Sequence, residues 1–163
     1  MTILRVFLML MLGLSAAACS KFPTYSGPEV THVLVNKGER RMHLIHHNEV
    51  LKSYDVGLGF APVGDKKIEG DGKTPEGSYT IDRRNPNSQF YLSIGVSYPN
   101  KDDRAEAKEL GKSPGGDIFI HGRPRKYRKG GQDWTAGCIA VTNREMREVY
   151  SMVKNGTPIT ITP

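Results

Sequence analysis

A histidine followed at some distance by a cysteine is the part of this sequence whose residue types could do chemistry. His121 ends a short apolar run, and Cys138 follows Gly137 at the start of a second apolar run. A thiol attacks a carbonyl carbon as its thiolate, and an imidazole is the usual side chain that takes the thiol proton. If the two runs are adjacent strands, they hold the sulfur and the imidazole together. The pair therefore predicts nucleophilic catalysis by Cys138 with His121 as its base, a nearby imidazolium stabilising the thiolate.

The first 18 residues carry the pattern of a secretion signal. Arg5 precedes an apolar run over 6–14, and small residues fill positions 15–18 before Cys19. Such a segment is removed from the mature protein and is too short to span a bilayer comfortably. We expect a signal peptide over 1–18 and a tether over 19–31, with Cys19 as a site of lipidation; ordinary cleavage after the alanines is the alternative. The expected location is the periplasm, with membrane contact only through that signal or lipid.

Export changes the meaning of the two cysteines. If Cys19 is lipidated, Cys138 is a lone thiol in an oxidising compartment, which is a liability unless the thiol is buried or reactive. A buried small apolar residue is the alternative, and the neighbouring glycine and upstream histidine favour reactivity. The net charge of +6 falls to +5 when Arg5 is removed with the signal. A mildly basic exported chain suits an anionic surface, whereas nucleic acid does not fit the compartment.

Short strands and two helices are expected around these residues. Strand-like apolar patterns, separated by turn residues, occupy 33–35, 42–46, 50–56, 78–81, 90–96, 117–121 and 158–162. A short charged helix is expected over 103–110. A second helix begins with a capping box at Thr142 and Glu145, and its apolar residues form one stripe. The pattern predicts one mainly β domain over 32–163, a sandwich or barrel with one or two helices.

Two motifs resemble those of the L,D-transpeptidase catalytic domain family (YkuD-like). The first is His121-Gly122 followed, after a variable loop, by Thr135-Ala136-Gly137-Cys138, which is similar to the family's His-Gly and Ser/Thr-x-Gly-Cys. The second, over 70–79, resembles the family's Gly-Asp-x-x-Thr-Pro-x-Gly-x-Tyr/Phe turn. A proline fixes one dihedral of that turn and a glycine permits a positive one. The resemblance spans the whole of 32–163 and implies the YkuD-like β sandwich or barrel.

The resemblance implies a reaction on peptidoglycan stem peptides. In the family, the cysteine attacks the amide between the L-centre of diaminopimelate and the following D-alanine. A thioester forms, and an amine or water resolves it. Carried over, Cys138 is the nucleophile and His121 is the base, oriented by a backbone carbonyl rather than by an acid. The N–H groups of Gly137 and Cys138 are the expected donors to the oxyanion.

Two departures leave the acceptor open. Many members have a histidine before the glycine and an arginine two residues after the cysteine, where this chain has Ala136 and Ala140. A subgroup of small members shares the Cys-x-Ala form, and it includes an enzyme that cuts peptidoglycan from an outer-membrane lipoprotein. A transpeptidase is therefore the first hypothesis. A hydrolase on the same fold, either an amidase releasing a wall-linked lipoprotein or an L,D-carboxypeptidase, is the second, and a lipoprotein that only binds the wall is the third.

The loop between the two catalytic residues is basic. It contains Arg123, Arg125 and Arg128. Because its ends are fixed beside the site, we expect it to overhang the site and, with Gly122, to hold stem carboxylates. A merely solvated loop is the alternative.

Two further side chains near the thiol have open roles. Trp134 either lines the cleft or anchors the loop by burial, and we favour the anchor. The Thr135 hydroxyl either bonds near the histidine or substrate, or satisfies the backbone of its own turn.

No metal or cofactor is expected. His43, His46 and His47 have no acid or thiol at ligand spacing, so they are interpreted as surface histidines of a strand. Gly72-Lys73-Thr74 mimics the end of a phosphate-binding loop, but Lys67 stands where the first glycine of that loop is required.

Overall fold

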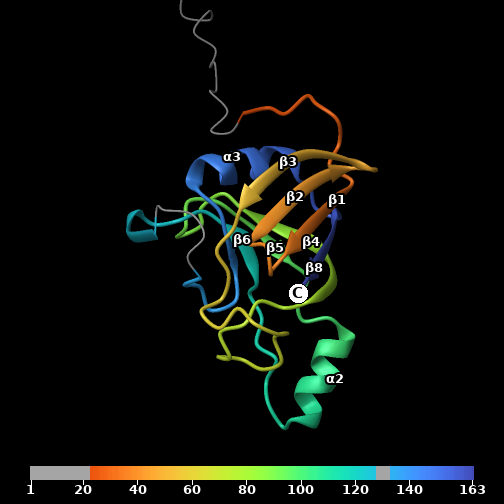
Figure 1. Cartoon of the computed structure of the whole chain (residues 1–163), viewed down its shortest axis with the longest axis vertical. Coiled ribbons are helices and arrows are strands. Elements are labelled where there is room, and N and C mark those ends of the chain that lie inside the picture. The colour runs from red at the N-terminus through yellow and green to blue at the C-terminus, as the bar shows by residue number, and fades with distance from the viewer. Residues whose placement is uncertain (1–22, 128–132) are drawn as a thin grey trace, which may run out of the picture.

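One curled sheet contains strands from both ends of the chain. The structure, a computed structural model, describes residues 23–127 and 133–163, and in these ranges eight strands have the order β3-β2-β1-β8-β4-β5-β6-β7 (Figure 1). The strands are β1 His32–Asn36, β2 Arg41–His46, β3 Glu49–Asp55, β4 Gly77–Asn85, β5 Ser93–Val96, β6 Phe119–His121, β7 Ile139–Ala140 and β8 Pro158–Thr162. The helical segments are α2 Lys101–Glu109, the 3-10 turn η1 Arg125–Tyr127 and α3 Asn143–Met152. The prediction of a single mainly β domain with one or two helices is confirmed.

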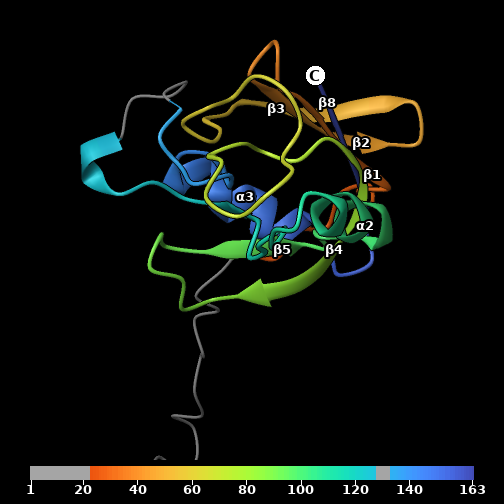
Figure 2. The ribbon, with the colours of Figure 1, turned by 90° about the horizontal axis from the view of Figure 1, so that it is seen from below.

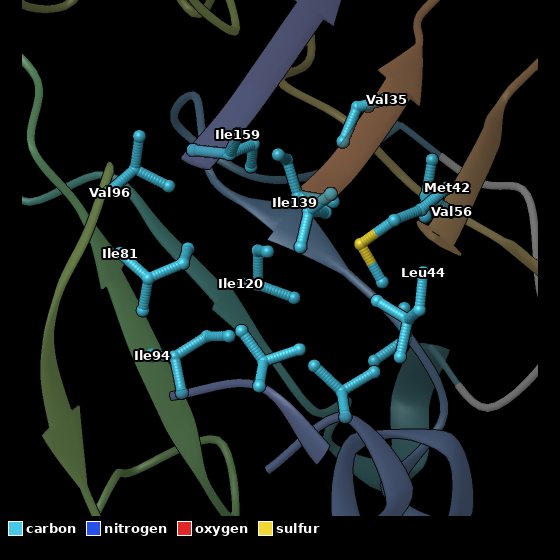
Figure 3. Close-up of a cluster of buried hydrophobic side chains, with 14 of the residues drawn as sticks. Val35, Met42, Leu44, Val56, Ile81, Ile94, Val96, Ile120, Ile139 and Ile159 are labelled. Atoms are coloured by element: carbon cyan, nitrogen blue, oxygen red, sulfur yellow. The ribbon is translucent and has the colours of Figure 1, made fainter. Parts of the chain in front are cut away.

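The curl of the sheet encloses the core. Alternate residues of β1 and β2, such as Val35 and Met42, are fully buried. They meet Ile94, Ile120 and Ile139 from the other half of the sheet in one cluster (Figure 3). Viewed from below, β4 and β5 lie on one side and β1 to β3 on the other (Figure 2). Period-two patterning of short strands produces this closure, because one face of each strand must leave water.

Helix α3 lies across one end of the curled sheet, and α2 lies toward the other end (Figure 1). The expected capping box is present: the Thr142 hydroxyl accepts from the Glu145 N–H, and the Glu145 carboxylate accepts from the Thr142 N–H. The buried stripe of α3 is Met146, Val149, Tyr150 and Met152. Within the described ranges, no helix has the length and apolar character needed to cross a bilayer.

Several predicted boundaries differ from the structure, and local backbone chemistry explains three of them. Strand β5 begins at Ser93 rather than at position 90, because Tyr91 adopts a φ of 77° and interrupts an extended chain. Strand β6 begins at Phe119 because Asp117 has a φ of 55°. Helix α2 begins at Lys101, two residues before the predicted start at position 103. The Asn100 side chain explains this start, because it accepts from two N–H groups of the first turn of the helix.

Candidate active site

Strands β4 to β7 line up two rows of residues on one face of the sheet. Asn85, Ser93 and His121 pair successively across β4, β5 and β6. In the neighbouring row, Arg83, Gly95 and Phe119 pair in the same way. Strand β7 is parallel to β6, and its register places Cys138, one residue before the strand, beside Phe119.

The sulfur and the imidazole therefore project from neighbouring strands into one cleft. The Phe119 N–H donates to Cys138 Sγ at 3.4 Å, which fixes the position of the sulfur. The cleft has a volume of about 560 Å³, within the size range of ligand sites. Its lining residues are Asn85, Ser88, Gln89, Phe90, Ser93, Asp117, Phe119, His121 and Cys138.

His121 is held in one tautomer. Its Nδ1 donates to the Gly122 carbonyl oxygen at 2.6 Å, and because a carbonyl only accepts, Nδ1 carries the proton and Nε2 is left as the base. The backbone carbonyl expected to orient the histidine is thus present. Phe90 stacks on the ring at 4.5 Å, and Trp134 packs against it edge-on at 5.7 Å. The imidazole is 3% exposed.

Burial sets the resting charges of the pair. It lowers the pKa of His121, helped by the nearby Arg123 cation and opposed by the bond to Gly122. Burial also raises the pKa of the Cys138 thiol, which the Phe119 N–H only partly offsets. Cys138 Sγ donates to the Asp117 carbonyl oxygen at 3.4 Å. At rest the geometry therefore favours a neutral thiol beside a neutral imidazole rather than the expected imidazolium and thiolate.

Gly122 is buried next to His121 and contacts the imidazole through its backbone. The residue is buried, and a Cβ there would lie 2.4 Å from Asn143 Oδ1 and 2.7 Å from the Phe90 carbonyl oxygen. Its own carbonyl orients His121. Gly122 is enclosed by α3 and the segment that precedes β5 and is not among the residues that line the cleft; its expected role in substrate binding stays a prediction.

Thr135 shapes the turn that carries Cys138. It is buried, its Oγ1 donates to the Cys138 carbonyl oxygen at 2.7 Å, and it accepts from the Gly137 N–H at 3.1 Å. The second of its two expected roles, a turn hydroxyl that satisfies the backbone, is the one observed. The Gly137 N–H, which was expected to face the oxyanion, is already engaged by this hydroxyl.

The second motif, the segment over 70–79, packs against the turn that carries Cys138. Gly137 has a φ of 135°, and a Cβ there would lie 2.6 Å from the Lys73 carbonyl oxygen. The hydroxyl of buried Thr74 accepts from the Gly59 N–H at 3.0 Å. Asp71 accepts from the N–H groups of three residues of its own loop. The two motifs, about 60 residues apart in the chain, are thus packed against each other, and glycine is required where they meet.

The basic loop differs from its expected arrangement. Arg123 is 3% exposed, and its Nη2 donates to the Ala140 carbonyl oxygen at 2.8 Å. The guanidinium thus contacts the backbone beneath the site, and Arg123 is not among the residues that line the cleft; its expected role in substrate binding stays a prediction. Arg125 is exposed in η1 and is not among the residues that line the cleft. Arg128 lies outside the described residues, as do Cys19 and the expected signal peptide.

Trp134 anchors the end of this loop. Its ring stacks on Tyr127 at 4.3 Å with an interplanar angle of 8°, and the backbone N–H groups of Trp134 and Thr135 both donate to the Leu58 carbonyl oxygen. The cleft is not lined by Trp134, so the packing interpretation agrees with the structure.

Several residues of the cleft could not be predicted from local patterns. Asn85 ends β4, Ser88, Gln89 and Phe90 come from the connection between β4 and β5, and Arg83 lies on β4 beside them. Nothing in their spacing points to Cys138, because antiparallel pairing brings them to it from about 50 residues upstream. A glycine inside β5, Gly95, was the available signal, since a strand glycine marks a close approach.

The three clustered histidines have other partners. His43 Nδ1 lies 2.7 Å from Ser53 Oγ, and His46 Nδ1 lies 2.7 Å from the Glu29 carbonyl oxygen. Among residues 23–127 and 133–163, no group of three side chains is arranged to hold a metal ion.

The fold and the cleft define a mainly β domain with a cysteine and a histidine on neighbouring strands. A family model described as the L,D-transpeptidase catalytic domain matches residues 30–161. This protein therefore belongs to the L,D-transpeptidase catalytic domain family.

Its relatives are longer proteins. YafK of Escherichia coli K12 is 30% identical over 128 residues, which cover 75% of this chain and 46% of YafK. The helical cell shape determining protein Pgp2 of Campylobacter jejuni has a solved structure with a TM-score of 0.63 and 31% identity, covering 84% of this chain and 49% of Pgp2. Bd1075 of Bdellovibrio bacteriovorus matches with a TM-score of 0.61 and 26% identity, covering 82% and 48%. The chain thus spans about half the length of each of these relatives.

Proposed function

We propose that this protein is a cysteine-dependent L,D-transpeptidase that acts on peptidoglycan stem peptides. One observation carries the proposal: Cys138 and His121 line the same open cleft, and the bond from Nδ1 to Gly122 leaves Nε2 as a base. Membership of the L,D-transpeptidase catalytic domain family supports the same reaction class.

The first half of the reaction forms a thioester. As the Cys138 sulfur attacks the amide carbonyl carbon after diaminopimelate, His121 Nε2 takes the thiol proton. The tetrahedral intermediate collapses, the C–N bond to D-alanine breaks, and Nε2 returns the proton to the leaving nitrogen. Because thiol and imidazole are both neutral at rest, proton transfer accompanies attack rather than preceding it.

The second half resolves the thioester. An acceptor amine attacks its carbonyl carbon, His121 takes a proton from the amine, and the sulfur leaves with that proton. We propose the Cys138 N–H as the main oxyanion donor, because the Thr135 hydroxyl engages the Gly137 N–H. A donor of this kind typically contributes about 10²–10³ in rate.

Hydrolysis on the same fold is the second candidate. The position two residues after the nucleophile, which many members fill with arginine, holds the fully buried Ala140, so no cation from β7 reaches an acceptor. Water instead of an amine would then complete the reaction, as in an L,D-carboxypeptidase or an amidase that releases a wall-linked lipoprotein.

Incubation with defined muropeptides followed by mass spectrometry tests these proposals. New dimers indicate transfer, and shortened or released stems indicate hydrolysis. The Cys138→Ala variant should give neither product. If that variant matches the wild type, Cys138 is not the nucleophile. A folded wild type that neither turns over substrate nor reacts with a thiol reagent or a carbapenem would leave only the wall-binding alternative.

The basic loop is proposed as an auxiliary contact to stem carboxylates through Arg125 and Arg128. The exposure of Arg125 supports this role. The double variant Arg125→Ala, Arg128→Ala should mainly raise KM; an unchanged KM would make the loop a solvated connection.

Export and lipidation are proposed from the N-terminal sequence alone. Cys19 after the small residues at 15–18 supports anchoring in the periplasm through a lipid. Labelled palmitate should be incorporated into the wild type and not into Cys19→Ser; equal labelling of both would refute lipidation at this residue.

A further inference from the structure

An arginine on β4, Arg83, extends across β5 and contacts two residues that line the cleft, Phe119 and Asp117. Arg83 on β4 pairs with Gly95 on β5, and Gly95 pairs with Phe119 on β6. A Cβ at Gly95 would lie 2.5 Å from Arg83 Cγ and 2.9 Å from its Nε. The Arg83 side chain therefore crosses β5 directly over Gly95. The side chain of any other residue at position 95 would lie too close to Arg83 in this conformation.

The Arg83 side chain ends close to the proposed nucleophile, Cys138. The Arg83 guanidinium carbon lies 4.6 Å from the centre of the Phe119 ring, and the Phe119 N–H is the donor to Cys138 Sγ. Nη2 donates to Asp117 Oδ1 at 3.1 Å, and Nη1 lies 3.4 Å from Asp82 Oδ2. The side chain is 43% exposed, and an arginine has five N–H donors, so it retains donors for a ligand.

Asp117, the partner of Arg83, lines the cleft, and Arg83 lies beside it. The Asp117 side chain is 89% exposed, although it takes part in an ion pair. Its φ of 55° turns its carbonyl to accept from Cys138 Sγ, which keeps this residue next to the sulfur. Exposed ion pairs contribute little to stability, so a ligand that offers both charges can open this pair at small cost.

We propose that Arg83 and Asp117 bind a free α-amino acid group, with Arg83 taking the carboxylate and Asp117 the ammonium. Resting on the proposed function, this inference identifies the group as the distal, D-configured centre of diaminopimelate in the donor stem. The site would thus select stems whose diaminopimelate keeps both charges and would disfavour stems already cross-linked or amidated at that centre.

The spacing agrees with such a ligand. Neighbouring strands are about 4.8 Å apart, so a guanidinium over the β6 ring lies about one strand from the sulfur before β7. The two centres of diaminopimelate are joined by four C–C bonds, which span about 5 Å when extended. A carbonyl at Cys138 therefore places the distal charges over Phe119, between Arg83 and Asp117.

The test compares three donor stems by kcat/KM. One has free diaminopimelate, one has its distal carboxyl amidated, and one has its distal amine acetylated. The wild type should prefer the free form by about 10- to 100-fold over each modified form, as expected for one charge-assisted bond. Arg83→Gln should lose discrimination against the amide only, and Asp117→Asn should lose discrimination against the acetylated form only.

Two further variants keep the result decisive. Gly95→Ala retains Arg83 but blocks its path, and it should reproduce the loss of discrimination against the amide. Arg41→Gln is the matched control, because Arg41 is a similarly exposed arginine paired with Asp55 and does not line the cleft. Its substrate ratios should equal those of the wild type. Ratios are compared because removal of the Asp117 charge also alters the thiol, equally for all three substrates.

The outcomes separate the inference from the function on which it rests. Equal turnover of the three stems by the wild type, with none by Cys138→Ala, overturns the inference and leaves the function standing. Equal losses on all three stems in Arg83→Gln also overturn it. Absence of turnover of any stem by folded wild type refutes the proposed function itself.

Discussion

His121 illustrates how little freedom a single side chain retains in this site. Its Nδ1 is bonded to Gly122, one face is stacked on Phe90, and an edge of Trp134 closes the side. Each contact favours the same orientation, with Nε2 directed away from the backbone carbonyl. The orientation thus comes from backbone and aromatic packing, with no carboxylate required.

Replacement of His121 by alanine should nearly abolish turnover. Without a base, the neutral, half-buried thiol has nothing to take its proton, and a loss of about 10²–10⁴-fold in kcat is expected. Steady-state kinetics on a defined stem peptide measures the loss, with circular dichroism as the control for folding. A loss of less than tenfold would mean that another group deprotonates Cys138.

The pH dependence follows from the directions of the two pKa shifts. A lowered pKa keeps His121 neutral to more acidic pH, so the acid limb of kcat/KM should lie below pH 6.5, the ordinary histidine value. A raised pKa keeps Cys138 protonated, so its direct alkylation in the His121→Ala variant should still increase above pH 9. A pH–rate profile measures the position of the acid limb, and iodoacetamide labelling at increasing pH measures the alkylation of Cys138. An acid limb above pH 7 would indicate an imidazolium at rest.

Thr135 should prove to be a positioning residue. Thr135→Val removes the bonds to the Cys138 carbonyl and the Gly137 N–H, leaving two buried groups unsatisfied at a cost of about 1–3 kcal/mol. We expect kcat to fall while KM changes little, because the turn and not the substrate contact is altered. Thr135→Ser retains the hydroxyl and should restore kcat; failure of that rescue would argue against the role.

At the scale of elements, α3 supports the site without entering it. The Asn143 side chain at its start accepts from the Arg123 N–H at 2.7 Å, and the Val141 N–H donates to the His121 carbonyl. The helix therefore holds the end of β6 from behind, while its apolar stripe packs in the core. Alternate residues of β6 face opposite sides of the sheet: Phe119 and His121 line the cleft, and Ile120 lies in the core.

Removal of the α3 cap should affect stability and not activity. Thr142→Ala deletes the hydroxyl that accepts from the Glu145 N–H, and such caps contribute about 1 kcal/mol. Urea unfolding should show that loss, while kcat per folded molecule stays unchanged. A large fall in kcat would mean that the start of α3 moves with His121.

At the scale of the whole molecule, a buried lysine ties the second motif to the sheet. Lys37, at the end of β1, is 2% exposed, and its Nζ donates to Glu76 and to the carbonyls of Gly64 and Thr74. The segment that braces Gly137 is thus fixed to a strand on the far half of the sheet. The Lys37 ammonium group thus links the closure of the curled sheet to the position of the turn at Gly137.

Lys37→Met should therefore be among the most destabilising single changes. It leaves the Glu76 carboxylate and two carbonyls without their cation, and loss of one partner of a buried pair typically costs about 3–5 kcal/mol. Denaturant unfolding measures the effect, with Arg41→Gln as an exposed control expected to change stability by less than about 1 kcal/mol. A loss below 1 kcal/mol for Lys37→Met would contradict this coupling.

Local patterns in the sequence were sufficient for the strands, for the α3 cap and for selecting His121 and Cys138, which line one cleft. Period-two alternation, a Thr-x-x-Glu box and the residues His121 and Cys138 each express chemistry that needs only near neighbours. The burial of Gly122, Arg123 and Thr135 could not be predicted, because burial depends on which elements cover a residue. Only the tertiary structure shows that residues of the β4–β5 connection line the cleft and that the Arg83 side chain crosses over Gly95. Strand pairing sets such contacts between residues far apart in the chain, and no local pattern encodes its register.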